Sequence, residues 1–193
     1  MAAFRIKHPQ RRNITRVVTS YNDHKADLRI DFNEHCGYCD CWDKFKTTYY
    51  EIDHFVPKSI LTKKLKTDYS NLVYSCKSCN NAKSNQWPTN DQNICNQNNQ
   101  GFIDPCQSDY ALQFERSDNG EIRWATELGK WMFIALKLHK PHHAIIWQLE
   151  RLGAMIDEIR QITVVNLNHP LKDDLLSICL QYIDYENQLR ELQ

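Results

Sequence analysis

Two periods of hydrophobic residues divide the first half of the chain into elements. Between residues 11 and 32 the apolar positions approximate one stripe of a helix, which predicts an N-terminal helix that ends near a cysteine pair. Residues 47–53 and 72–74 are short runs rich in β-branched and aromatic side chains, and each run predicts a strand. Residues 77–85 lack such a run and end before a Trp-Pro pair, so they predict a short helix. The stripe of the first helix consists of Ile14, Val17, Val18, Tyr21 and Leu28.

An Asn/Gln-rich tract at residues 89–100 is too polar to pack and marks the expected domain boundary. Residues 1–88 would then form one unit, with the N-terminal helix and the cysteine pairs. Residues 101–193 would form a second region, joined to the first by the polar linker.

The second region is expected to contain a hairpin followed by three helices. Residues 110–114 and 121–124 flank Ser-Asp-Asn-Gly at 117–120, which is a favourable hairpin turn. The third helix repeats its apolar residues at a spacing of about 3.5, and Asn168 is placed to cap it. Helices this apolar on one side bury that side against each other, the first unit or another chain, and packing within the chain is favoured over a dedicated groove for a partner. The three faces are Trp124, Leu128, Trp131, Ala135 and Leu138; Ile145, Leu149, Leu152, Ile156 and Ile159; and Leu171, Leu175, Ile178, Tyr182, Tyr185, Leu189 and Leu192.

Charge is balanced over the whole chain but uneven along it. Lys and Arg number 24, as do Asp and Glu, so net charge favours no particular partner. Residues 1–30 carry seven basic and two acidic side chains and residues 54–90 carry six and one, whereas residues 101–193 carry nine and fourteen. A basic face for phosphate joined to an acidic helical part would produce this distribution. The alternative is that these segments cancel one another once the chain folds.

The cellular compartment is inferred from the lengths of the apolar runs. The N-terminal residues lack the apolar stretch of a secretory signal, and no run approaches the ~18 apolar residues of a spanning helix. We therefore expect a cytoplasmic protein. Thiols stay reduced there, which favours a metal ion over disulfides for paired cysteines.

Two Cys-x-x-Cys pairs, Cys36/Cys39 and Cys76/Cys79, carry the clearest chemical signal in the sequence. Each pair aims two sulfurs at one point, and two pairs supply the four ligands that structural zinc prefers. The 36 residues between the pairs make a longer loop than that of a small zinc ribbon. The other cysteines are expected to be unpaired thiols: Cys41, Cys95, Cys106 and Cys179.

Four polar residues between and beside the cysteine pairs are candidates for catalysis. Asp53 and His54 end the first predicted strand, Asn71 begins the second, and Asn80 follows the fourth cysteine on the short helix. Zinc would draw both strands and the helix start together and bring these residues toward one pocket. Carboxylate and amide oxygens suit magnesium or manganese, and a neighbouring imidazole can take a proton from water near neutral pH. The expected chemistry is metal-assisted hydrolysis of a phosphodiester.

The segment CGYC…EIDHFVPKS…NLVYSCKSCNNAK, residues 36–83, resembles the HNH endonucleases, which have a ββα-metal fold, in their zinc-knuckle variant. The resemblance implies that His54 is the general base and that Asp53 binds the catalytic metal. Asn71 would brace the loop and orient the imidazole. Asn80 stands where the family often has histidine and would be the second ligand of that metal.

Three further charged residues are candidates for the same site. Glu51 lies two residues before Asp53 on the same side of the strand, so it either assists the metal or is a solvated carboxylate. Lys83 shares a helix face with Asn80 and is expected to contact a substrate phosphate, with an ordinary surface lysine as the alternative. Lys58, in the lysine-bearing loop after the first strand, is expected to bind substrate as well.

A second resemblance covers more of the chain. The N-terminal helix, the stretches GFIDP, YALQF and NGEIRW, and the helical tail are similar to HNH effectors of bacterial anti-phage systems of the Septu and retron-associated (PtuB-like) type. Those are small nucleases that work with a separate ATPase. The resemblance implies that the C-terminal helices are where an ATPase partner docks.

The sequence as a whole predicts an α+β protein with a zinc-stabilised ββα-metal core, an N-terminal helix and a C-terminal hairpin with three helices. The expected function is a Zn-stabilised endonuclease that hydrolyses nucleic acid, DNA rather than RNA, with one Mg²⁺ or Mn²⁺. One alternative is a catalytically silent zinc module that binds nucleic acid or protein. Another is a subunit whose helices carry its main task and whose nuclease is idle until assembly.

Overall fold

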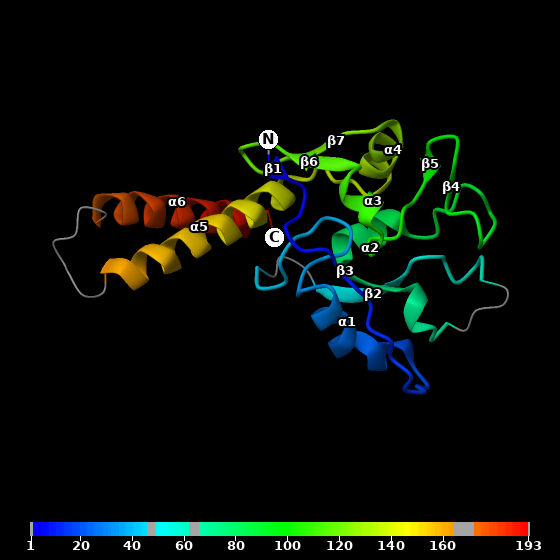
Figure 1. Cartoon of the computed structure of the whole chain (residues 1–193). Helices are drawn as coiled ribbons and strands as arrows, with labels where there is room; N and C mark the ends of the chain where they lie inside the picture. The colour runs from blue at the N-terminus through cyan, green and yellow to red at the C-terminus, as the bar shows by residue number, and fades with distance from the viewer. Residues whose placement is uncertain (1, 46–48, 62–65, 164–171, 193) are drawn as a thin grey trace.

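The computed structural model describes residues 2–45, 49–61, 66–163 and 172–192. Small sheets and short helices form a compact body, from which two long helices project (Figure 1). The elements, in chain order, are β1 (Ala2–Ala3), a 3₁₀ turn (Tyr21–His24), α1 (Lys25–Asp31), β2 (Tyr50–His54), a second 3₁₀ turn (Tyr69–Asn71), β3 (Leu72–Cys76), α2 (Lys77–Lys83), β4 (Asn96–Gln97), β5 (Gln100–Gly101), α3 (Ser108–Ala111), β6 (Phe114–Arg116), β7 (Ile122–Trp124), α4 (Glu127–Ala135), α5 (Pro141–Thr163) and α6 (Lys172–Glu191). The α+β class is confirmed.

The ββα unit predicted from the sequence is present. Strands β2 and β3 pair antiparallel, with Tyr50 opposite Cys76 and His54 opposite Leu72. Strand β3 runs directly into α2, and the Cys76 thiol caps the helix by accepting a hydrogen bond from the Cys79 amide at 3.5 Å. Helix α2 then packs against both strands. The predicted first strand begins later than expected, at Tyr50, and residues 47 and 48 lie outside the described residues.

The long N-terminal helix predicted for residues 11–32 is wrong in its first half. Regular helical structure is confined to the 3₁₀ turn and α1, and residues 11–18 have none. Four β-branched residues in this stretch lower its helix propensity, and its arginines are held by distant groups. Arg11 donates to the Leu72 carbonyl at 2.7 Å and to both oxygens of Asp104. Val17, assigned to the apolar stripe, is 96% exposed.

The predicted hairpin is confirmed around its turn. Strands β6 and β7 pair antiparallel across Ser117–Gly120, where Gly120 adopts a φ of +84° and donates to the Ser117 carbonyl. Strand β1 adds to the outer edge of β6, so the sheet order is β1-β6-β7. The first strand lies later in the chain than expected. Of residues 110–114 only Phe114 belongs to β6, which continues to Arg116, and Tyr110 belongs to α3.

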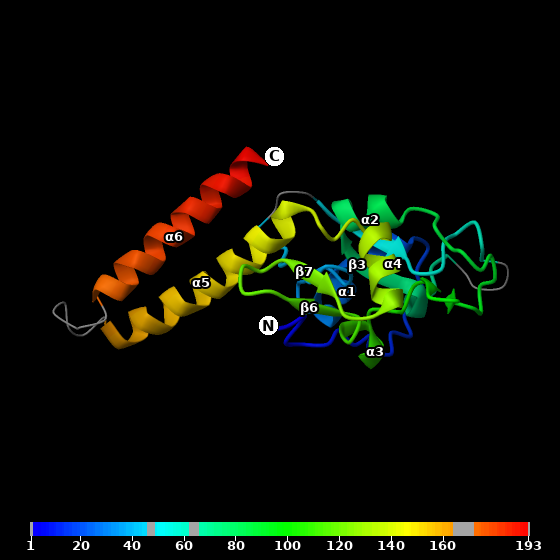
Figure 2. The ribbon, with the colours of Figure 1, turned by 90° about the horizontal axis from the view of Figure 1, so that it is seen from above.

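Three helices complete the chain, as predicted. Helix α4 is shorter than the predicted helix, which was expected to include Trp124 and Leu138. Trp124 lies in β7, and Leu138 lies beyond the end of α4. Helices α5 and α6 pack against each other along an arm that points away from the body (Figure 2). Asn168 and Leu171, the expected cap and first apolar residue of the last helix, lie outside the described residues.

A single hydrophobic cluster extends through the body, from Phe4 and the cysteine segment to Leu149 on α5 and Leu189 on α6. The Asn/Gln-rich tract does not interrupt this cluster, because part of the tract folds as the β4–β5 hairpin. Phe102, the residue after β5, stacks on Trp87 with the ring centres 6.2 Å apart. The division into units 1–88 and 101–193 stays a prediction. Among the described residues, no helix is both long and apolar enough to cross a membrane.

Candidate active site

Four thiols form a buried cluster where the first cysteine segment meets β3 and α2. The sulfurs of Cys36, Cys39, Cys76 and Cys79, hereafter the thiol cluster, lie within 4.8 Å of one another, and none of the eight cysteines, all of them within the described residues, forms a disulfide. The Cys39 and Cys76 sulfurs are 3.8 Å apart. Two ligands of a tetrahedral zinc with 2.3 Å bonds are separated by about the same distance. The donor type, number and spacing therefore fit a structural zinc ion.

The backbone holds the two cysteine pairs in place. The Cys36 amide donates to the Cys41 carbonyl at 2.9 Å, and the Gly37 amide donates to the Tyr74 carbonyl of β3 at 2.8 Å. A side chain at Gly37 would collide with Phe32 and Val73, at 2.6 and 2.8 Å from its Cβ. The sequence thus supplies glycine where the first pair packs against β3.

A cavity of about 460 Å³ lies at the C-terminal end of β2 and the adjacent part of α2. Glu51, Asp53, His54 and Asn80 all line it, and so does Lys58. Four of the predicted site residues, together with the expected substrate lysine, therefore border one space. Asn71 does not line this cavity.

The environment of His54 defines its tautomer. Its Nε2 lies 2.7 Å from the Lys66 carbonyl oxygen, which can only accept a hydrogen bond, so Nε2 carries the proton and Nδ1 is the basic nitrogen. The ring is buried, and the edge of Tyr21 contacts it with ring centres 4.8 Å apart. Burial lowers the pKa of His54 below its ordinary value, and the positive charge of Lys58 lowers it further. The imidazole is therefore neutral at pH 7.

Asp53 is buried between two partners. Its Oδ2 accepts a hydrogen bond from the Tyr38 hydroxyl at 2.5 Å and an ion-paired hydrogen bond from the Lys83 ammonium at 3.0 Å. Burial raises the pKa of Asp53, while Lys83 and Tyr38 act in the opposite direction. Tyr38 stands between the two cysteines of the first pair, so it connects the thiol cluster to this carboxylate.

Lys83 and Lys58 occupy different environments. The Lys83 side chain is fully buried, and besides its ion pair with Asp53 it donates to the His54 carbonyl at 2.9 Å. The Lys83 ammonium is therefore not placed to contact a substrate phosphate, and Lys83 is not an ordinary surface lysine. Both alternatives given from the sequence are wrong for this residue. Lys58 is exposed at the cavity edge, with its ammonium 5.0 Å from the centre of the Tyr21 ring.

Asn80 and Glu51 contact each other across the β2–α2 packing. The Asn80 side-chain amide donates to Glu51 Oε2 at 2.7 Å. Both line the cavity beside Asp53, so three oxygen-bearing side chains border the same space. Glu51, left open as a solvated carboxylate, is half-buried and has this partner.

Asn71 braces the turn that follows β2. Its side chain accepts from the Val56 amide at 2.9 Å and donates to the Val56 carbonyl at 3.0 Å, while its own carbonyl accepts from the Phe55 amide. The backbone of Phe55 and Val56, directly after His54, is thus held by hydrogen bonds to Asn71. This contact supports the imidazole through the backbone and not by direct contact.

Two residues of the site were not anticipated from the sequence. Tyr38 was visible only as the third letter of CGYC, a tyrosine whose burial would require a partner for its hydroxyl. Tyr21 was assigned to the apolar stripe of a helix, and only the fold places it against His54.

Comparison with known proteins agrees with this geometry. Residues 36–86 match the model of the family described as HNH endonuclease, a range that includes both cysteine pairs, β2, β3 and α2. This part of the chain therefore resembles an HNH domain, its cysteine cluster suits zinc, and the match indicates nucleic-acid nuclease activity. No curated protein and no solved structure matches the chain.

Proposed function

We propose that the protein is a metal-dependent endonuclease that hydrolyses phosphodiester bonds of DNA. One observation carries the proposal: an imidazole whose Nδ1 is the basic nitrogen borders the same cavity as the oxygen donors Glu51, Asp53 and Asn80. An imidazole alone or a carboxylate alone has many structural explanations. Their convergence on one space at the end of the ββα unit is what phosphodiester hydrolysis requires.

The residues divide the reaction between them. His54 Nδ1 accepts a proton from a water molecule, and the resulting hydroxide attacks the phosphorus while the bond to the leaving oxygen breaks. Asp53 and Asn80 would hold a Mg²⁺ or Mn²⁺ ion, which stabilises the negative charge on the leaving oxygen. Tyr38 and Lys83 both bind Asp53 Oδ2, so we assign Oδ1 to the ion. Glu51 orients Asn80 by accepting from its side-chain amide, and the Asn80 carbonyl oxygen would be the ligand of the ion.

Substrate binding is assigned to cations at the cavity edge. Lys58 is exposed there, and Lys25 also lines the cavity. Exposed lysines at the entrance of an active site attract the phosphate backbone without reading sequence. Lys83 is excluded from this role by its burial.

The test is cleavage by purified protein and by His54→Ala, with plasmid, single-stranded DNA and RNA, in Mg²⁺, Mn²⁺ or EDTA. Removing a general base lowers the rate by about 10²–10⁴-fold. His8→Ala is the matched control, since His8 is an exposed histidine outside the cavity lining. Full-rate cleavage by His54→Ala would refute the catalytic assignment. Salt-sensitive binding with no cleavage by the wild type would favour the silent zinc module, and faster cleavage of RNA would correct the substrate.

The cellular role we propose is that of a cytoplasmic nuclease effector in anti-phage defence, with an ATPase partner on the C-terminal helices. It is supported by the resemblance to PtuB-like effectors and by an apolar stripe on α6 that faces solvent, Leu176, Leu180 and Ile183, each 50–60% exposed. Co-purification with an ATPase encoded beside this protein would test it. Leu180→Lys should reduce recovery of the ATPase, whereas Gln181→Lys, one residue along the helix, should not.

A further inference from the structure

We infer a second metal site, in which Cys39, Cys41 and His143 bind a thiophilic divalent ion next to the thiol cluster. Cys39 would be shared, its sulfur bridging the two ions. The three ligand atoms lie within 4.8 Å of one another, and all three residues are buried. Cys41 was expected from the sequence to be a spare thiol, and His143 lies 102 residues away from it.

The distances suit coordination. The Cys41 sulfur is 3.4 Å from His143 Nδ1. A tetrahedral zinc with a sulfur ligand at 2.3 Å and a nitrogen ligand at 2.0–2.1 Å separates those two atoms by about 3.5 Å. A thiol–imidazole hydrogen bond has a similar length, so the distance permits a metal without requiring one.

The state of the imidazole favours the metal over the hydrogen bond. Within the described part of the chain, His143 Nε2 is buried and has no hydrogen-bond partner. The polar contact of the ring is therefore a weak one, from Nδ1 to sulfur, and the energetic cost of the unpartnered Nε2 is the same with or without a metal ion on Nδ1. A bond from Nδ1 to a metal ion would compensate for burying this ring, whereas a contact to sulfur does so poorly.

A second ion would also bring the net charge of the buried site closer to zero. Zinc bound by four thiolates leaves a net charge of minus two in the interior, and the buried Arg116 guanidinium, which donates to the Cys39 carbonyl at 2.8 Å, offsets one of these charges. A second divalent ion, bound with one additional thiolate from Cys41, offsets the other. Buried charge is costly unless it is compensated, so the neutral arrangement is the more stable one.

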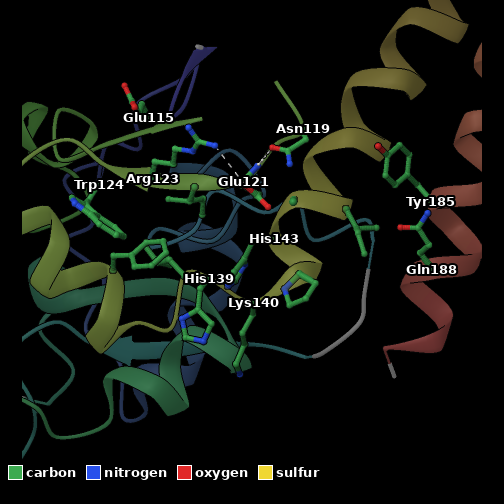
Figure 3. A pocket seen from close by; sticks show the side chains of 16 residues that line it. Glu115, Asn119, Glu121, Arg123, Trp124, His139, Lys140, His143, Tyr185 and Gln188 are labelled. Atoms are coloured by element: carbon green, nitrogen blue, oxygen red, sulfur yellow. Dashed lines mark hydrogen bonds and ion pairs between the residues drawn. The ribbon is translucent and has the colours of Figure 1, made fainter. Parts of the chain in front are cut away.

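The C-terminal half approaches the cysteine segment at several points around this site. Besides His143, Arg116 contacts Cys39, and Lys140 donates to the Ser78 hydroxyl of α2 at 3.0 Å. His143 and Lys140 stand at the start of α5, at the edge of a cavity of about 720 Å³ below the β6–β7 hairpin (Figure 3). His143 lines that cavity.

The test is the number of metal ions per chain. Full-length protein is saturated with Zn²⁺, freed of excess metal and measured by elemental analysis, and the expected content is two zinc ions per chain. Cys41→Ser and His143→Gln should each reduce it to one. Cys179→Ser, which removes a cysteine on α6, is the matched control and should retain two.

A second measurement needs no variant. Protein loaded with ¹¹³Cd²⁺ should give two cadmium resonances, coupled to each other through the bridging thiolate. One zinc ion per chain at saturation together with a single cadmium resonance would overturn the proposal. Two ions in both Cys41→Ser and His143→Gln would overturn it equally, because the second ion would then be bound elsewhere. These outcomes do not depend on nuclease activity.

Discussion

At the scale of single residues, the proposed hydrolysis depends on how burial sets the protonation of His54. The imidazole must be neutral to accept a proton, and burial lowers its pKa below the ordinary value of about 6.5. Cleavage should therefore persist below pH 6.5 and fall only as the pH drops through the lowered pKa. The measurement is kcat against pH at saturating DNA. A rate that already falls between pH 7.5 and 6.5 would contradict the assigned environment.

Lys58 provides a second test of the same pKa. Its positive charge disfavours the imidazolium, so Lys58→Gln should raise the pKa of His54 and shift the acidic limb of the kcat profile to higher pH. Because the profile is taken at saturation, weaker DNA binding by the variant does not obscure the shift. Lys77→Gln, an exposed lysine on α2, is the control and should leave the limb in place. An unmoved limb in Lys58→Gln would mean that His54 does not sense this charge.

Lys83 is predicted to stabilise the fold through Asp53. Lys83→Met would leave a buried carboxylate without its cation, which costs about 3–5 kcal/mol of unfolding free energy. The loss should shrink at low pH, because the variant further raises the pKa of Asp53 and the carboxyl becomes neutral as pH falls through it. Denaturant unfolding at several pH values measures both effects. Lys77→Met should change stability by less than about 0.5 kcal/mol. Equal stabilities for the two variants would show that the ion pair contributes nothing.

Sequence reasoning found some of these residues and missed others for a physical reason. Asp53, His54 and Asn80 could be brought together from their spacing, because strand and helix periodicity place them relative to the cysteines. The position of Lys83 could not, since a lysine on a short helix becomes interior only when other segments cover it. Here the Phe102 ring, whose centre lies 5.6 Å from the Lys83 ammonium, comes from beyond the polar tract.

At the scale of elements, the contrast lies between the ββα unit and the N-terminal segment. The unit was predictable because cysteine spacing, strand composition and the Trp-Pro stop all indicate the same elements. Residues 11–18 were not, because their stripe of apolar residues resembles a helix while the Arg11 side chain is held by distant partners. Tertiary contacts such as those of Arg11 with Leu72 and Asp104 overrode a weak local preference.

Zinc in the thiol cluster should determine whether the ββα unit folds. Structural zinc contributes about 10–16 kcal/mol in zinc-finger peptides, comparable to the 5–15 kcal/mol by which whole domains are stable. Cys79→Ser, or removal of zinc by a strong chelator, should therefore abolish cleavage and the cooperative thermal transition followed by circular dichroism. Cys179→Ser should retain both. A zinc-free protein with an unchanged transition would show that the thiols are only packed side chains.

At the scale of the whole molecule, the interior joins the HNH segment to residues that follow it. The Tyr110 hydroxyl donates to the Tyr38 carbonyl at 2.8 Å, and Arg5 donates to the carbonyls of Gly37 and Pro105. Arg116, fully buried, reaches the Cys39 carbonyl from β6. Hydrogen bonds from residues outside the matched segment thus hold the backbone carbonyls of residues 37–39, in the first cysteine pair. Composition alone could not reveal them, because it records the polarity of the 89–100 tract and not what packs beside it.

A fragment of residues 1–88 should therefore fold poorly even with zinc. It keeps all four ligands of the thiol cluster but exposes Tyr38, Trp87 and Lys83. The fragment lacks Tyr110, which donates to the Tyr38 carbonyl, and Phe102, which covers Trp87 and the Lys83 ammonium. We expect no cooperative unfolding transition and little cleavage. A chain that ends at Thr163 is the control for truncation itself, because α6 packs chiefly against α5. That control should retain the transition and the cleavage. If the short fragment unfolded cooperatively with the stability of the full chain, the division at the polar tract would hold, and the contacts of Tyr110 and Arg116 would join two units that are each already stable.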